Sequence, residues 1–310
     1  MSTLALVLAD ISATRLWQAL FSGVAVGAKY ALVALGFVVI FKATGVINFA
    51  QASFVLVGGY LTFNGVTTWG MGFYTAVVAA MIGGALIGIA LEGLVLRRMV
   101  GQQPFTLIMV TIGVLYVIDN IVTAIWGPGT QTLGDPWGTK TVQVGSVLFA
   151  HRELWSIAIT AVVLAAFFAF FRFSPLGLAM RATALDQEAA LAQGISARKV
   201  FRMSWAIAGV IAALSGVMLS AGGAQLNPTV GLVALAAFPA MILGGLESPL
   251  GAVVGGLIIG LVQQLTALLQ PEYAAWLGDS FDRVSPYLVM ILILLVRPYG
   301  LFGTREVRRV

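Results

Sequence analysis

The sequence has no cysteine and very little charge. Because none of its 310 residues is a cysteine, disulfides, thiolate metal sites and cysteine nucleophiles are excluded. Only 9% of the residues are charged, whereas a soluble domain has about 25%. Hydrophobic residues make up 60% of the chain, and the mean hydropathy is +0.99. Only a polytopic membrane protein fits this balance, since a helix that crosses a hydrocarbon core of roughly 30 Å needs about 20 apolar residues.

Nucleotide-binding and catalytic motifs are also missing. A P-loop needs a lysine directly after a glycine, and none of Lys29, Lys42, Lys140 and Lys199 follows one. The chain therefore cannot hold ATP in that way, and a cycle driven by ATP would depend on another subunit. The sequence has no GxSxG elbow and no HExxH helix. Its single histidine, His151, cannot build a metal site without partners.

The apolar segments predict an all-α polytopic membrane protein with about eight or nine transmembrane or half-spanning helices, residues 1–310 forming one transmembrane domain. Half-spans are expected because the seventh and ninth segments are short and the second carries polar side chains. The first fifteen residues hold an apolar run too short for a signal-peptide core, and they predict an in-plane interfacial helix. The nine segments cover roughly residues 16–41, 46–64, 73–96, 104–126, 153–171, 204–223, 232–246, 250–270 and 284–297.

The distribution of basic residues predicts the orientation, because Lys and Arg gather in cytoplasmic loops. With the N-terminus outside, 12 of the 17 basic residues fall inside and four outside, and Lys29 is left within the first segment. This split favours an N-out, C-in topology. It makes residues 127–152 an external loop and places residues 271–283 on the same side. Each stretch is either a face for an external partner or a solvated loop.

A polar stretch, residues 172–203, interrupts the chain between the fifth and sixth segments on the predicted cytoplasmic side. Thr183 is a good N-cap, and Asp186 three residues on completes a start like a capping box. The pattern predicts a helix over Ala184–Gln193. Gly194 is expected to end it in the left-handed conformation. The predicted cytoplasmic loop therefore contains a short helix of its own.

A helix of about ten residues is marginal alone in water, so this one needs a surface to pack on. Leu185, Ala189 and Ala192 fall on one face at helical spacing. Such a small apolar face suits a groove on a cytoplasmic partner, and the alternative is a linker helix that rests on its own bundle. Ser196 is expected to cap the helix that follows.

The run EAALAQG at 188–194 resembles the EAA-type coupling loop of bacterial ABC importer permeases. The wider chain resembles the branched-chain amino acid permease family, the subunit type called LivH. The family commonly has a small or apolar residue where Lys29 stands. The matching runs occur in order over most of the chain: YALVALGFVVIFKATGVINFAQ (30–51), VGGY (57–60), LEGLVLRRMVG (91–101), LGLAMRATALDQEAALAQGI (176–195), LGGLESPLGAVVGGLIIG (243–260) and VRPYGLFG (296–303).

The resemblance implies a permease subunit of an ABC importer in the bacterial inner membrane, which moves branched-chain amino acids or a related small solute inward by alternating access. ATP hydrolysis is expected on a separate subunit, so the chain would not be an enzyme, and no cofactor is implied. The implied partners are cytoplasmic ABC ATPases, a second permease subunit (homologous or identical), an external solute-binding protein and the lipid bilayer, without nucleic acid. The residues implied in coupling to the ATPase are Thr183, Leu185, Asp186, Glu188, Ala189, Ala190 and Gly194.

Polar side chains inside apolar segments are candidates for the translocation path. Lys29 either faces the path or a helix interface, or its ammonium group snorkels to the membrane edge. Asn48 and Gln51 lie in a broken segment, where they contact solute or hydrogen-bond between helices. Asp119, beside Asn120, either lines the path or is a structural partner near the outer surface.

Two local packing features are predicted as structural. Glu92 lies about one and a half helical turns before Arg97 and Arg98, which predicts an ion pair that fixes a helix end. The small-residue pairs Gly251–Gly255 and Gly256–Gly260 predict close helix packing, with a flexing helix that forms a gate as the alternative.

Two other function classes compete with the importer permease. A secondary transporter of a small polar solute, driven by an ion gradient, would need buried acids in several spans, and only Asp119 is clearly deep. A membrane-embedded enzyme would need clustered His, Asp and Ser side chains near one face. One histidine in an outer loop argues against it.

Overall fold

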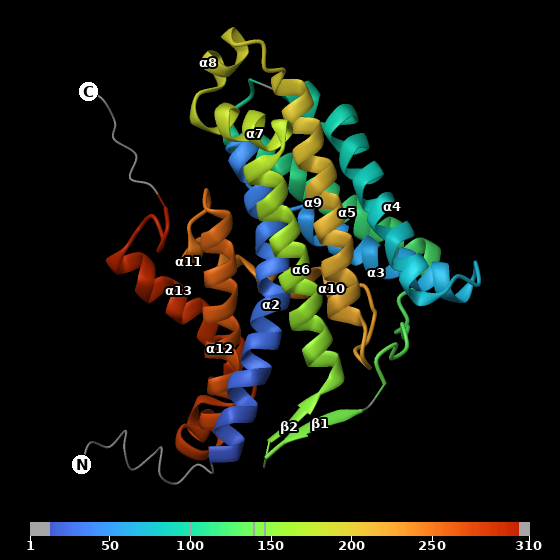
Figure 1. The fold of residues 1–310 in the computed structure, drawn as a ribbon, viewed down its shortest axis with the longest axis vertical. Helices are drawn as coiled ribbons and strands as arrows, with labels where there is room; N and C mark the ends of the chain where they lie inside the picture. Colours follow the sequence, from blue (N-terminus) through green and yellow to red (C-terminus); the bar gives the residue numbers. More distant parts are fainter. Residues whose placement is uncertain (1–12, 100, 139, 146, 304–310) are drawn as a thin grey trace.

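The computed structural model describes residues 13–99, 101–138, 140–145 and 147–303, a bundle of helices with one short hairpin (Figure 1). The interfacial helix predicted for the first fifteen residues lies mostly outside the described residues. The long helices are α2 (Ala13–Thr44), α4 (Phe73–Leu94), α5 (Pro104–Trp126), α6 (His151–Phe173), α9 (Ala197–Ser220) and α12 (Pro249–Tyr273). The shorter elements are α3 (Gln51–Thr67), α7 (Pro175–Leu185), α8 (Gln187–Ala192), α10 (Val230–Leu235), α11 (Phe238–Gly244), α13 (Ser285–Val296), the 3-10 helices η1 (Leu96–Met99), η2 (Ala275–Leu277) and η3 (Phe281–Arg283), and strands β1 (Thr141–Val144) and β2 (Val147–Ala150).

Each predicted apolar segment is helical, which confirms the all-α polytopic class. In the described part of the chain, six helices are long and apolar enough to cross a membrane. The other three segments are shorter: α3 has 17 residues, α13 has 12, and the seventh segment is broken into α10 and α11. Pro239 lies in the first turn of α11, where a residue without an N–H group is tolerated. The chain is a multi-pass membrane protein.

The two ends of the bundle differ. α8 projects at one end, and the hairpin of β1 and β2 lies at the other (Figure 1). We name them the α8 end and the hairpin end. Helix α2 has 32 residues, which at about 1.5 Å per residue gives a length of roughly 48 Å. It runs beside α6, α9 and α12 and forms the axis of the bundle.

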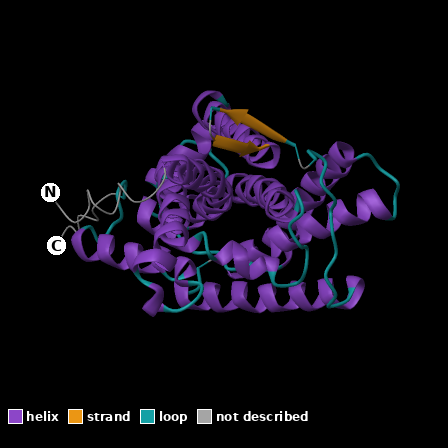
Figure 2. Ribbon diagram, turned by 90° about the horizontal axis from the view of Figure 1, so that it is seen from below, coloured by secondary structure: helices purple, strands orange, loops and turns teal. Residues whose placement is uncertain are grey.

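The hairpin lies within the predicted external loop 127–152 and adds β structure to an otherwise helical chain. β1 and β2 pair antiparallel from Thr141 opposite Ala150 to Val144 opposite Val147. The view from the hairpin end shows the two strands at the edge of the bundle (Figure 2). The Phe149 ring meets the Phe21 ring of α2 edge-on, with 4.5 Å between centroids. The sequence prediction treated this stretch as loop and did not include the hairpin.

Small residues bring the central helices close together. A Cβ atom added at Gly260 of α12 would fall on the backbone of Gly27 in α2, and one added at Gly256 would meet Ala31. The close packing predicted for the glycine pairs of α12 is thus confirmed. The opposite edge of the same helix packs on α11 in the same manner, and α9 packs on α4 and α3. The pairs in these seams are Gly251 with Gly244, Gly255 with Ala240, Gly209 with Gly84, and Gly58 with Ala213.

Candidate coupling and solute-binding sites

The predicted helix over Ala184–Gln193 is two helices in the structure. α7 ends at Leu185, and α8 begins at Gln187. Thr183 is therefore not an N-cap, and its hydroxyl instead donates to the Ala179 carbonyl inside α7 at 2.9 Å. Asp186, in extended conformation between the helices, is the N-cap, because its Oδ1 accepts from the Ala189 N–H at 2.9 Å. The prediction placed the cap three residues too early.

The other end of α8 matches the prediction. Gly194 has φ +81°, a left-handed conformation that costs glycine little. Its N–H donates to the Leu191 carbonyl at 2.9 Å, and the Ile195 N–H donates to the Ala190 carbonyl at 3.0 Å. These two bonds form a Schellman motif. With Asp186 at the start, α8 is closed at both ends by its own residues.

The loop 172–203 presents apolar side chains to its surroundings. Leu185 is 89% exposed and Leu191 is 51% exposed. Ala190, which is 5% exposed, is the residue of α8 that packs inward. Of the seven residues implied in coupling, Thr183 and Ala190 are buried, and Leu185, Asp186, Glu188, Ala189 and Gly194 are exposed.

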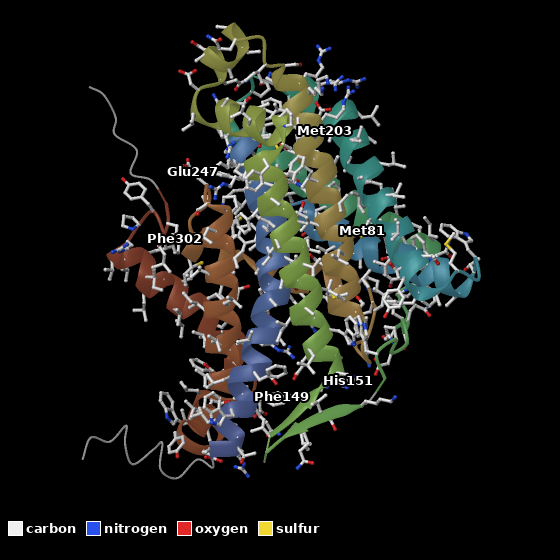
Figure 3. All side chains as sticks on the ribbon, viewed as in Figure 1. Met81, Phe149, His151, Met203, Glu247 and Phe302 are labelled. Carbon is white, nitrogen blue, oxygen red and sulfur yellow. The ribbon has the colours of Figure 1, made fainter. Side chains whose placement is uncertain are left out.

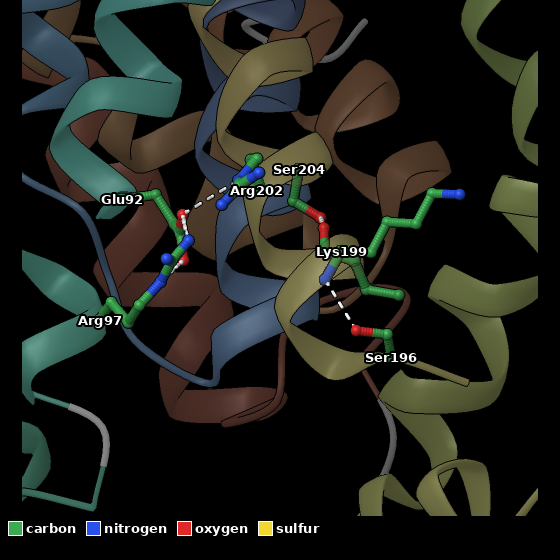
Figure 4. A network of polar contacts seen from close by, with 7 residues as sticks. Glu92, Arg97, Ser196, Lys199, Arg202 and Ser204 are labelled. Atoms are coloured by element: carbon green, nitrogen blue, oxygen red, sulfur yellow. Dashed lines mark hydrogen bonds and ion pairs between the residues drawn. The ribbon is translucent and has the colours of Figure 1, made fainter. Parts of the chain in front are cut away.

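Helix α9 connects this loop to the bundle. Ser196 caps it as predicted, with its Oγ accepting from the Lys199 N–H at 3.4 Å. Two turns on, the Arg202 Nε lies 3.8 Å from Oε2 of Glu92 in α4. Glu92 also pairs with Arg97, whose Nη2 and Nε donate at 2.8 and 3.3 Å (Figure 4). The predicted Glu92–Arg97 ion pair is confirmed. It ties η1 to the end of α4, and the Arg202 contact joins α4 to the start of α9.

Asn48 and Gln51 are buried at the start of α3, with 1% and 0% exposure. Gln51 Nε2 donates to the Ala208 carbonyl of α9 at 3.2 Å, and Asn48 Oδ1 accepts from the Ala50 N–H at 3.1 Å. Within the described part of the chain, Asn48 Nδ2 and Gln51 Oε1 have no hydrogen-bond partner. Asn48 thus fixes the turn before α3, Gln51 bonds α3 to α9, and each side chain keeps one polar atom without a partner among the described residues.

Lys29 lies where α2 meets the start of α6. Glu153 attracts its ammonium group and Arg152 repels it. Ser22, two turns earlier on the same face of α2, donates to Glu153 Oε1 at 3.0 Å. The lysine thus belongs to a polar cluster between α2 and α6.

Asp119 and Asn120 point in different directions from α5. Ser53 of α3 donates to Asp119 Oδ1 at 2.6 Å, so Asp119 faces the bundle. Asn120 is exposed, and its Nδ2 donates to the Tyr116 carbonyl of its own helix at 2.8 Å. The structure therefore brings Asn48, Gln51 and Asp119 to α3 and does not bring Lys29 or Asn120 to them.

A cavity of about 380 Å³ opens at the α8 end, between α2, α4, α5, α8 and α9. Leu107 and Trp205 contribute to its apolar wall, and Asn48 and Arg97 contribute polar groups. Gln187, the first residue of α8, also lines it. Sequence reasoning missed this cavity because its wall comes from separate segments between residues 40 and 205.

The lone histidine takes no part in these sites. His151 begins α6 beside the hairpin, far from Met203 at the opposite end of the bundle (Figure 3). Among the described residues, no group of three His, Cys, Asp or Glu side chains is placed to hold a metal ion.

Comparisons with a family model and with individual proteins point to the same family. The model described as "branched-chain amino acid transport system / permease component" matches residues 19–296. The high-affinity branched-chain amino acid permease protein LivH of Salmonella typhimurium is 30% identical over 308 residues, covering 94% of this chain and 97% of LivH. BraD of Pseudomonas aeruginosa, described in the same terms, is 27% identical over 312 residues, with the same coverage. The fructose import permease FruF of Bifidobacterium longum is 24% identical, covering 86% of this chain and 73% of FruF.

Proposed function

The chain belongs to the family of branched-chain amino acid transport permeases, and on this premise we propose that it carries a branched-chain amino acid, or a closely related small solute, into the bacterial cytoplasm across the inner membrane. Family members are permease subunits of ABC importers and not enzymes. The relatives described as branched-chain amino acid permeases match nearly the full length of both chains. The sugar permease FruF matches at lower identity and coverage. This difference supports an amino acid as the solute.

The α8 end is the proposed cytoplasmic end, where partner ATPases bind the loop 172–203. The observation that carries this proposal is Leu185, 89% exposed beside a capped helix at the tip of the molecule. Exposed apolar surface costs about 25 cal/mol per Å² relative to burial. Leu191, 51% exposed on α8, adds to the same surface. A docked ATPase would bury both leucines.

The remaining partners are proposed for the other surfaces. In α5 and in α6, only 17% of the 18-residue apolar stretch that could cross the membrane is buried within the chain. These helices face lipid or the second permease subunit. The hairpin and the η2–η3 region, where Trp276 is 83% exposed, form the face offered to an external solute-binding protein.

The docking proposal is tested with Leu185→Asp. A carboxylate at this exposed position costs the isolated chain little, but it would be buried without a partner in the interface. We expect normal membrane levels, loss of ATPase subunits during co-purification in mild detergent, and loss of solute uptake. Leu185→Met, which keeps an apolar side chain of similar volume, is the matched control and should behave as wild type. Retained uptake and co-purification in Leu185→Asp would refute this docking surface.

A further inference from the structure

The cavity at the α8 end has the dimensions and chemistry of a small-molecule site. Its volume of about 380 Å³ falls within the roughly 300–1,000 Å³ typical of such sites. Ile40, Leu107 and Trp205 supply apolar wall. The mouth is polar, because Gln102 and Gln187 line it and both are exposed.

The polar groups of the cavity call for a ligand with a hydrogen-bond acceptor. Asn48 lines the cavity and is 1% exposed, and its buried Nδ2 atom has no hydrogen-bond partner in the described part of the chain. The Oδ1 atom is occupied by the Ala50 N–H, so the free atom is a donor. A buried donor left unpaired costs about 1–3 kcal/mol, which a bound acceptor would recover.

The charge near the cavity favours an anionic acceptor. Arg97 gives two N–H groups to Glu92, and a guanidinium carries five, so three remain. Arg202 adds a second positive charge 3.8 Å from the same carboxylate. Two arginines against one glutamate leave net positive charge at this cluster. A small carboxylate with an apolar remainder matches both the donors and the apolar wall.

We propose that this cavity is a product-sensing site, which binds an apolar amino acid from the cytoplasm and slows the transport cycle. The identity of the ligand rests on the proposed function, because such an amino acid is the product that would accumulate beside the opening. Gln187, the first residue of α8, lines the cavity, so a bound ligand contacts the helix on which the ATPases act. A filled cavity holds α8 against α4, α5 and α9 and opposes the movement that the ATPases impose on it. The coupling is reciprocal, so the movement also weakens ligand binding.

The test uses the assembled transporter in lipid nanodiscs, where both membrane faces are accessible, with saturating leucine-loaded external binding protein. ATP hydrolysis is measured while free leucine is added. Because the binding protein is already saturated, any effect of the added leucine must come from another site. We expect hydrolysis to fall about fivefold or more, the lower bound of usual allosteric coupling. Leu107→Trp fills the cavity permanently and should therefore hydrolyse ATP at a slow rate that free leucine does not change, whereas Leu107→Met should be inhibited as wild type. No inhibition of wild type, or a Leu107→Trp variant that leucine still inhibits from the full wild-type rate, overturns the proposal.

Equilibrium binding separates this proposal from the proposed function. Without binding protein, radiolabelled leucine should bind the wild-type transporter saturably and should not bind Leu107→Trp or Asn48→Leu. If loaded binding protein fails to stimulate hydrolysis, the proposed solute is wrong, and this binding result alone decides the cavity. The 2-oxo analogue of leucine should compete if the carboxylate is the group recognised, and failure to compete would refute the carboxylate assignment.

Discussion

At the scale of single residues, the buried carboxylate of Glu92 makes the sharpest prediction. Its side chain is 4% exposed and bonds Arg97 in a two-point contact. Arg97→Met would leave the charge buried with only Arg202, 3.8 Å away. Breaking a buried pair by removing one partner costs about 3–5 kcal/mol, and the remaining arginine puts the expected loss near the lower bound. Chemical denaturation of the purified protein measures it.

Arg98→Met is the matched control for that change. Arg98 is exposed in the same 3-10 helix, so its loss should alter stability by less than about 0.5 kcal/mol. Equal effects of the two variants would contradict a specific role for the Glu92 contact.

Residues with local partners were predictable, and those with distant partners were not. Gly194 and Ser196 act within three residues of themselves, and Glu92 meets Arg97 five positions on. The free donor of Asn48 could not be foreseen, because its environment comes from segments that are far apart in the chain. Even a local rule failed at Thr183. Both Thr183 and Asp186 are good caps by type, and in the structure Thr183 is buried within α7 while Asp186 caps α8.

At the scale of helices, the glycine seams predict where bulk cannot be added. Gly260→Ala would place a methyl group on the backbone of Gly27 in α2. The helices would have to separate, and overpacking of this kind costs about 1–3 kcal/mol. A lower thermal unfolding midpoint in detergent is the expected result.

Gly113→Ala serves as its control, since nothing lies within 4 Å of a Cβ atom added there. Alanine is the better helix former by about 0.8–1.0 kcal/mol. The midpoint should therefore stay or rise. If Gly113→Ala lowered the unfolding midpoint as much as Gly260→Ala, the close contact between α12 and α2 would not be the cause of the Gly260→Ala effect.

The positions of helices were predicted more reliably than their boundaries. Long apolar runs set α4, α5 and α6 within a few residues. The start of α9 at Ala197, well before its apolar run, was predicted from its Ser196 cap and not from hydrophobicity. The break between α10 and α11 and the hairpin were not predicted. Each depends on how a short stretch packs against the finished bundle.

At the scale of the whole molecule, the absence of cysteine makes the orientation directly measurable. A cysteine introduced at Gln143 in β1 should react with a membrane-impermeant thiol reagent added to intact spheroplasts. A cysteine introduced at Arg198, at the start of α9, should react only in inside-out vesicles. Both positions are exposed and lie at opposite ends of the bundle. The reversed pattern would contradict the N-out, C-in topology, and the parent protein supplies a background without reactive thiols.

The self-contained ends of α8 have a consequence for how tightly a partner holds on. Asp186 accepts from the Ala189 N–H at the first turn, and Gly194 and Ile195 donate to the Leu191 and Ala190 carbonyls at the last. An incoming subunit need not supply partners for these three groups. In the proposed docking, recognition rests on shape and on the exposed methyl groups of Leu185 and Leu191. Such contacts need few directional bonds, so one pair of ATPase subunits could serve several permeases that present a similar helix.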